Sequence, residues 1–158
     1  MYFGSGRAGG KGSSDLYRCP LQNGNYSTIE SLGDSVNTPD NEYEPFIAPD
    51  ESYVIFMSTV PRGLANADFY ISYQHKGTWG KSQKLRYPFN SDATEFSPKI
   101  TSDGKYFLFS SARNKLQHRL PKPATIRELN NCIRNAGNGL GDIYYIDLSV
   151  LNIHKYVN

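Results

Sequence analysis

Residues 42–58, EYEPFIAPDESYVIFMS, combine a short strand pattern, a turn and a second, more apolar strand pattern. The turn is predicted at 49–52, where Pro49 and Asp50 are residue types that turns favour. Residues 53–58 are mostly aromatic or β-branched, as in a strand that is buried on both faces. This stretch therefore predicts a β-hairpin.

The hairpin pattern recurs along the chain. Residues 94–111, TEFSPKITSDGKYFLFSS, repeat it, and the chain opens with MYFGSGR, the end of another copy. Successive copies are offset by 53 residues, a step shared by Phe3, Phe56 and Phe109. The same step relates further identical or similar residues: Asp15/Asp68, Tyr17/Tyr70, Tyr26/Trp79, Leu32/Leu85, Asn37/Asn90, Glu42/Glu95, Pro45/Pro98 and Asp50/Asp103. So many positions at one spacing indicate an internal structural repeat.

Each repeat is expected to contain four strands, called a to d in chain order. In the middle copy they are predicted near 44–48, 53–58, 68–73 and 79–85. Four-stranded antiparallel units that repeat every ~40–50 residues are typical of β-propellers. The predicted fold class is therefore all-β, a β-propeller segment of about three four-stranded antiparallel blades. Antiparallel strands would place the b–c loops and the d–a connections at the same end of every blade.

The whole chain, 1–158, is expected to form one partial propeller. Strands b to d of the first blade would lie in 1–40, the second blade in 41–91 and the third in 92–158. Closed propellers have about four to eight blades, so the chain is predicted to be a fragment or half of a larger propeller. Open blade edges favour self-association, and closure with a second chain is the corresponding expectation.

The third copy contains 21 additional residues between strands b and c, an insertion at about 114–140. Thr125 and Glu128 have capping-box spacing, and apolar residues follow at helical intervals. A short amphipathic helix is therefore predicted over about 126–136. Residues 113–140 carry six Lys or Arg residues and a single acid, which gives this segment a charge of +5 and leaves −3 for the rest of the chain.

Three motifs of the third copy are PKITSDGK at 98–105, FSSAR at 109–113 and DIY at 142–144. They resemble the motifs of the TolB-type, WD-repeat-like β-propeller family. Related motifs stand in the two earlier copies, so the resemblance covers nearly the whole chain. The chain resembles the C-terminal half of a six-bladed member of that family.

The resemblance implies a propeller that serves as a binding scaffold, a subunit of a complex or an appendage of an enzyme. It also implies an extracytoplasmic location, in a bacterial periplasm or secreted. The middle copy departs from the family pattern, since Glu51 and Ser52 stand in place of Gly-Lys and Val60 in place of arginine.

Acidic residues that recur in each copy are expected to meet the needs of every blade. Asp50 and Asp103 are predicted to cap the a–b turns. The acids that begin strand c are predicted to accept backbone hydrogen bonds: Asp15, Asp68 and Asp142.

Four further charged residues that recur are candidates for binding. Glu42 and Glu95 are expected at the d–a crossing near the mouth of the central channel, and Arg7 and Arg113 follow strand b. These residues either line a binding site or bond to a neighbouring blade.

Basic residues that do not recur are the better functional candidates, because blade geometry does not require them. Arg62, Lys115, Arg119 and Arg127 are expected on the face formed by the b–c loops and the d–a connections. There they either form a solvated basic surface or attract a protein partner, an anionic small molecule or a glycan.

Sequence signs of catalysis and of cofactors are weak. The histidines His75, His118 and His154 are scattered, and no nucleophile-elbow motif is present. We expect no metal and no cofactor, and Cys19 and Cys132 are expected to stay unlinked. The net charge of +2 argues against nucleic-acid binding, and the absence of a run of about 18 apolar residues argues against a membrane span.

The predicted function is a non-catalytic β-propeller scaffold that binds a protein or ligand on this loop face. The alternative is part of a propeller hydrolase or lyase that acts on carbohydrate or peptide, with Glu42, Glu95, Arg7 and Arg113 at the channel mouth. Glycoside hydrolysis by the two glutamates requires carboxyl groups about 5–10 Å apart.

Overall fold

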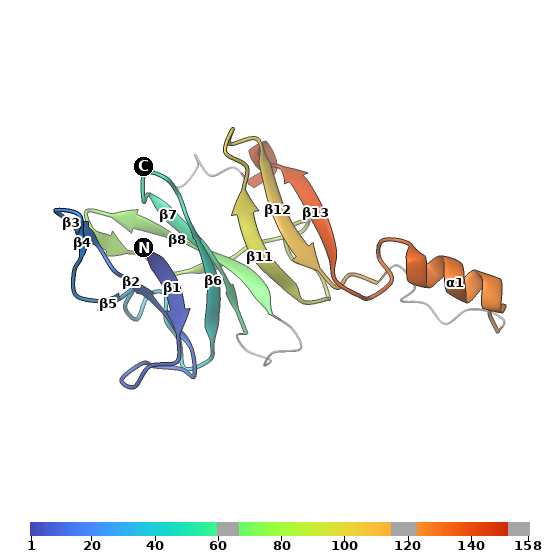
Figure 1. Cartoon of the computed structure of the whole chain (residues 1–158), viewed down its shortest axis with the longest axis horizontal. Coiled ribbons are helices and arrows are strands. Elements are labelled where there is room, and N and C mark those ends of the chain that lie inside the picture. The colour runs from blue at the N-terminus through green and yellow to red at the C-terminus, as the bar shows by residue number, and fades with distance from the viewer. Residues whose placement is uncertain (60–66, 115–122, 152–158) are drawn as a thin grey trace.

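The computed structural model describes residues 1–59, 67–114 and 123–151. Arg62, Lys115 and Arg119, three of the predicted binding residues, lie outside the described residues. The described part forms antiparallel sheets and one α-helix, which extends away from the sheets (Figure 1). The expectation of a β-protein with one short helix is confirmed.

Three sheets follow one another along the chain. The first has the order β1-β2-β5, the second β6-β7-β8-β10 with β9 also pairing to β8, and the third β11-β12-β13. A separate hairpin joins β3 and β4. The strands are β1 (Tyr2–Ser5), β2 (Asp15–Arg18), β3 (Leu21–Gln22), β4 (Asn25–Tyr26), β5 (Glu30–Ser31), β6 (Glu42–Ile47), β7 (Tyr53–Ser58), β8 (Asp68–His75), β9 (Thr78–Trp79), β10 (Gln83–Lys84), β11 (Glu95–Ile100), β12 (Tyr106–Ser111) and β13 (Asp142–Asp147), and a 3₁₀ turn, η2 (Leu148–Leu151), follows.

The second and third sheets repeat the same backbone irregularity. β6 pairs with β7 and β11 pairs with β12, and the register shifts at the same place in both pairs. At that place Glu44 and Ser97 have φ values of 50° and 57°, in the left-handed region. The Ser97 N–H donates a hydrogen bond to the Glu44 carboxylate. The bulge is therefore a feature of the repeat and also a contact between the two sheets.

The predicted caps of the a–b turns are present. Oδ1 of Asp50 accepts hydrogen bonds from the backbone N–H and the hydroxyl of Ser52. Oδ1 of Asp103 accepts from the Lys105 N–H and the Thr101 hydroxyl. These hydrogen bonds lower the pKa of both aspartates below the usual value.

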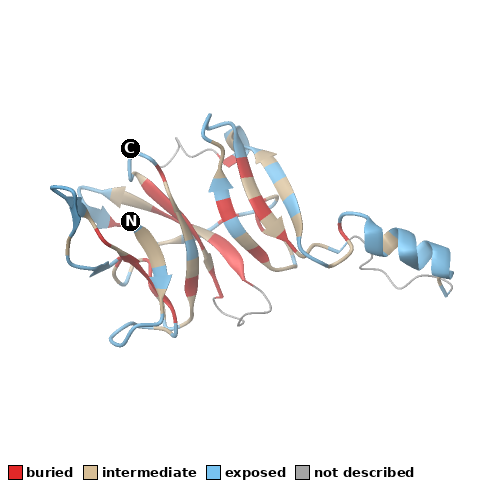
Figure 2. Ribbon diagram, viewed as in Figure 1, coloured by how far each residue is buried: buried red, intermediate tan, exposed pale blue. Residues whose placement is uncertain are grey.

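Two apolar clusters hold the sheets together, and Figure 2 shows them as buried segments of the strands. In the cluster between the first and second sheets, the Trp79 ring meets Tyr2 edge-on at 6.2 Å. In the cluster between the second and third sheets, Phe69 meets Phe107 and Phe109 edge-on at 5.5 and 5.8 Å. Aromatic side chains therefore pack together with aliphatic ones in the clusters that join neighbouring sheets.

A buried asparagine fastens each connection between sheets. Oδ1 of Asn37 accepts from the Leu16 N–H and its Nδ2 donates to the Leu16 carbonyl. Asn90 bonds Phe69 in the same way. The side-chain amide thus supplies the hydrogen bonds that the backbone of a neighbouring strand would otherwise supply. This explains why asparagine recurs at the 53-residue step.

The strand predicted over 79–85 is instead two short strands, β9 and β10. The chain leaves β8 between them, where the Ser82 N–H donates to the carbonyl of Ser35 in the connection between the first and second sheets. A bond to another sheet therefore interrupts the expected strand.

The helix α1 (Ile126–Arg134) has the predicted capping box. The Glu128 N–H donates to the Thr125 hydroxyl, and the Thr125 N–H donates to the Glu128 carboxylate. The helix ends two residues before the predicted limit of 136, at the cap residue Asn135, which has an extended backbone. No described helix is long and apolar enough to cross a membrane.

Candidate functional site

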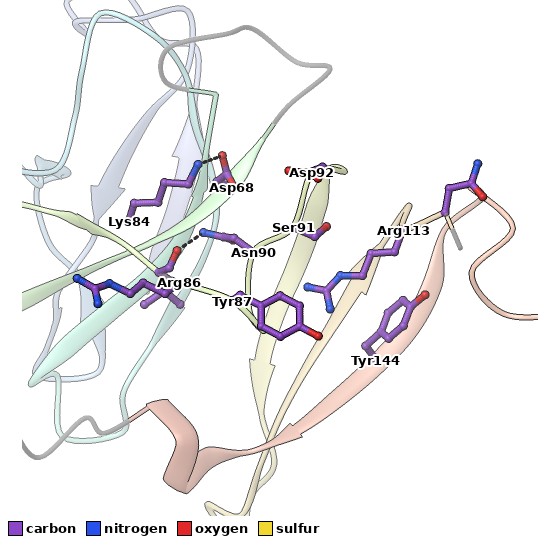
Figure 3. Close-up of a pocket in the computed structure, with 11 residues that line it drawn as sticks. Asp68, Lys84, Arg86, Tyr87, Asn90, Ser91, Asp92, Arg113 and Tyr144 are labelled. Atoms are coloured by element: carbon purple, nitrogen blue, oxygen red, sulfur yellow. Dashed lines mark hydrogen bonds and ion pairs between the residues drawn. The ribbon is translucent and has the colours of Figure 1, made fainter. Parts of the chain in front are cut away.

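A pocket of about 1000 Å³ opens between the second and third sheets. It lies at the end of the sheets where β8 begins and β12 ends, which is the end at which the sequence placed the b–c loops and d–a connections. In Figure 3, Asp68 and Lys84 lie on one side of the pocket, and Arg113 and Tyr144 lie on the other. The lining residues are Asp68, Lys84, Leu85, Arg86, Tyr87, Asn90, Ser91, Asp92, Arg113, Asn114 and Tyr144.

Asp68 and Lys84 form an ion pair in the wall of the pocket. Lys84 Nζ lies 2.6 Å from Oδ2 of Asp68, and the aspartate side chain is 9% exposed. Oδ1 of Asp68 and the hydroxyl of Tyr144 are both buried and have no hydrogen-bond partner within the described part of the chain. An unpaired buried polar atom costs about 1–3 kcal/mol. One such atom on each side of the pocket favours a polar ligand there.

The prediction that the acids at the start of strand c accept backbone hydrogen bonds is confirmed twice. Asp15 accepts from the Gly12 N–H and Asp142 from the Gly137 N–H. In both cases the donor comes from the b–c segment. The corresponding segment of the second sheet, 60–66, lies outside the described residues, and Asp68 instead pairs with Lys84.

Arg113 is built into the wall of the pocket. Its guanidinium lies over the rings of Phe109 and Tyr144, 5.0 and 5.3 Å from their centroids. Nη2 donates to the carbonyls of Pro88 and Phe89 in the connection from the second to the third sheet. Arg113 therefore clamps that connection onto the third sheet, one of the two roles that the sequence allowed for it.

Arg7 occupies the matching place in the first sheet but is not part of the pocket. Its guanidinium lies over Phe3 and Tyr17, at 5.2 and 4.6 Å, and Nε donates to the Ser5 hydroxyl. The residue is exposed. Arg127 is also exposed, on α1, which extends away from the sheets and the pocket (Figure 1).

Glu42 and Glu95 are fully buried and therefore line no solvent-filled channel mouth. Glu42 accepts from the Thr38 N–H and hydroxyl and from the Ser58 hydroxyl. Burial raises the pKa of Glu42, and these hydrogen bonds partly offset the rise. Glu95 repeats the arrangement.

The partners of Glu95 are the equivalent residues one repeat later. It accepts from the N–H and hydroxyl of Ser91 and from the hydroxyl of Ser111. Nε of Arg113 lies 3.3 Å from its Oε1. Each glutamate thus ties the start of an inner strand to the connection that precedes it.

Arg86 and Tyr87 are pocket residues that the sequence analysis did not single out. Both are exposed, and Tyr87 is 82% exposed. One repeat earlier the chain has Gly33 and Asp34 at these places. A departure from the repeat is the signal that could have identified them, since the same reasoning selected Arg62 and Arg127.

Metal binding finds no support in the described residues, which contain no group of three or more His, Cys, Asp or Glu side chains placed to hold an ion. Cys19 and Cys132 are both free thiols, as predicted. No protein-family model matches the sequence, and no curated protein matches it. The pocket between the second and third sheets is therefore the best candidate site.

Proposed function

We propose that this chain is a non-catalytic binding module, built as three consecutive blades of a TolB-like β-propeller. The step of 53 residues, the shared register of the hairpins and the buried glutamates and asparagines at equivalent positions support the blade assignment. The blades would span 1–40, 41–91 and 92–158, with the insertion in the third.

The pocket between the second and third sheets carries the functional part of the proposal. Concave sites with a few converging polar groups are where small ligands bind. The wall combines the unpaired Asp68 Oδ1, an acceptor, with the Tyr144 hydroxyl, and Tyr87 adds an exposed aromatic ring. A ligand rich in hydroxyl groups, which both donate and accept, matches this set, and a glycan is the corresponding class.

The enzyme alternative loses its main support. A hydrolase or lyase that uses Glu42 and Glu95 needs both carboxyl groups in contact with substrate and water. Both side chains have no exposed surface, and their oxygens are bonded to hydroxyl and N–H groups of the sheets and connections.

A glycan-array screen followed by calorimetry on the best hit tests the proposal. We expect Tyr87→Ala to weaken binding about tenfold or more, because it removes the exposed ring of the pocket, and a tenfold change corresponds to about 1.4 kcal/mol. Tyr26→Ala is the matched control, since Tyr26 is 62% exposed on β4, part of the first third of the chain. It should leave affinity unchanged.

Two results would contradict the assignment. One is the absence of any glycan hit together with capture of an acidic peptide, which would make the partner a protein. The other is glycan binding that survives Tyr87→Ala unchanged.

A further inference from the structure

One face of the third sheet carries large apolar side chains that no described element covers. Ile143 is 80% exposed and Tyr145 is 72% exposed, and Tyr106 of the neighbouring strand is 40% exposed. Leu108 lies between them in the register of β12 and β13, opposite Tyr145. These four residues are called the open face of the third sheet.

The same positions are buried in the second sheet. Tyr53, Ile55, Phe69 and Ile71 correspond to the four residues of the open face, and all are at most 9% exposed. They belong to the apolar cluster shared with Phe107 and Phe109 of the third sheet. The repeat therefore shows what normally covers this face, namely the opposite face of the next sheet.

The first sheet has the matching opposite face. Phe3 and Tyr17 correspond to the residues through which the later sheets contact the sheet before them, such as Phe109 and Tyr144. The Phe3 and Tyr17 rings are stacked, 6.1 Å apart and 26° from parallel. The Phe109 and Tyr144 rings stack alike, 5.6 Å apart and 25° from parallel. No described sheet lies against Phe3, so this is called the receiving face of the first sheet.

Arg7 occupies the same position in the receiving face that Arg113 occupies in the corresponding face of the third sheet. Both guanidinium groups lie over the Phe and Tyr pair of their sheet. Arg113 is half-buried because the connection from the preceding sheet lies against it and accepts its hydrogen bonds. Arg7 is exposed. Its Nε donates to the Ser5 hydroxyl, and the exposed guanidinium is accessible to a sheet from outside the chain.

We infer that a second copy of this chain seats the receiving face of its first sheet on the open face of the third sheet. The contact would continue the packing that already joins the first sheet to the second and the second to the third. It is a head-to-tail contact, which forms a ring when the rotation closes. Two copies supply six sheets, within the range of about four to eight for closed propellers, whereas three copies supply nine. A dimer with two identical contacts is therefore expected.

The inference rests on the blade geometry proposed above and is independent of the glycan. Static light scattering of the full chain after gel filtration should show twice the chain mass of 17.8 kDa. Ile143→Asp places a charge on the open face and should weaken dimerisation at least tenfold. Because Ile143 is 80% exposed, circular dichroism and the melting curve should confirm that the variant still folds.

Ile126→Asp is the matched control. Ile126 is 79% exposed on α1, away from both faces, and this variant should remain dimeric. Arg7→Glu should also weaken the dimer, from the receiving face. A mixture of the Ile143→Asp and Arg7→Glu chains should associate more tightly than either alone, because one of its two contacts is unaltered.

A chain that stays monomeric at several hundred micromolar would overturn the inference, and so would a dimer that only Ile126→Asp disrupts, which would place the contact on α1. A monomer that still binds glycan through Tyr87 would leave the proposed function standing. A dimer without glycan binding would leave only this inference standing.

Discussion

The second and third sheets carry apolar side chains at equivalent positions, yet their burial is opposite. Phe69 and Ile71 of β8 are 0% and 3% exposed, while Ile143 and Tyr145 of β13 are 80% and 72% exposed. Each strand pairs with the strand before it in the same register. The difference therefore comes from the neighbour, since the third sheet covers the second and no described sheet covers the third. An apolar strand shows that a face is suited to burial, not what buries it.

The largest expected effect tests this comparison directly. Phe69→Ala should lower the free energy of unfolding by about 3–5 kcal/mol, because it leaves a cavity between two sheets. Ile143→Ala at the equivalent place should cost less than about 0.5 kcal/mol in the dilute monomer. Urea denaturation of both variants measures the difference. Equal losses would mean that the open face is covered in the monomer.

A second variant tests the hydrogen bonds that Asn90 makes to the backbone of β8. Asn90→Ala removes three hydrogen bonds, from the Phe69 N–H and to the carbonyls of Phe69 and Leu85. We expect a loss of about 2 kcal/mol, because the buried Phe69 N–H loses its acceptor, although the Phe69 carbonyl still accepts from the Leu85 N–H.

Hydrogen exchange gives the residue-level readout of that change. The Phe69 amide should exchange slowly in the wild type and much faster in Asn90→Ala. The Ile143 amide, which has no such asparagine among the described residues, should exchange quickly in both. Protection of the Phe69 amide that survives the substitution would show that β8 does not depend on Asn90.

The smallest expected change in stability concerns the turn between β6 and β7 and the equivalent turn between β11 and β12. Glu51 and Gly104 stand one repeat apart, with φ values of 58° and 69°. Gly104→Ala should cost about 1 kcal/mol, because an L-residue is strained in this region and a Cβ would gain no contact within 4 Å. Glu51 tolerates the same conformation while its carboxylate accepts a hydrogen bond from the Tyr2 hydroxyl at 2.8 Å.

The matching substitution at the second turn completes the test. Glu51→Gly relieves the backbone but removes the bond to Tyr2, so its net effect should be smaller than that of Gly104→Ala. Thermal melts of both variants measure it. A larger loss for Glu51→Gly would mean that the contact to Tyr2 outweighs backbone strain.

The sequence predicted features that depend on residues close together in the chain or on the repeat itself. The hairpins, the Asp50 and Asp103 caps and the helix that begins after Thr125 are of this kind. Arg113 was also identified, because it recurs. The break between β9 and β10 was not predicted, since it depends on a hydrogen bond between Ser82 and Ser35 of another sheet.

The candidate site was predicted only in part. Its end of the molecule followed from strand order and Arg113 from the repeat, but Glu42 and Glu95 proved to be buried. The sequence does not distinguish a buried carboxylate from an exposed one. The hydroxyl groups that bond Glu42 and Glu95 come close to them only when the connections fold back onto the strands. Tyr87 departs from the repeat but was not singled out, and its place in a pocket depends on two sheets meeting.

The amino-acid sequence alone predicts the period of 53 residues, the antiparallel hairpins and the capped turns and helix, because each depends on local backbone preferences or on identical residues at one spacing. The packing of the sheets shows which faces are buried, which charged side chains are bonded within the protein and where a pocket opens. Burial and hydrogen-bond partners depend on which sheet lies next to which. That arrangement placed Phe69 inside the molecule and left Ile143, its counterpart one repeat later, on the surface.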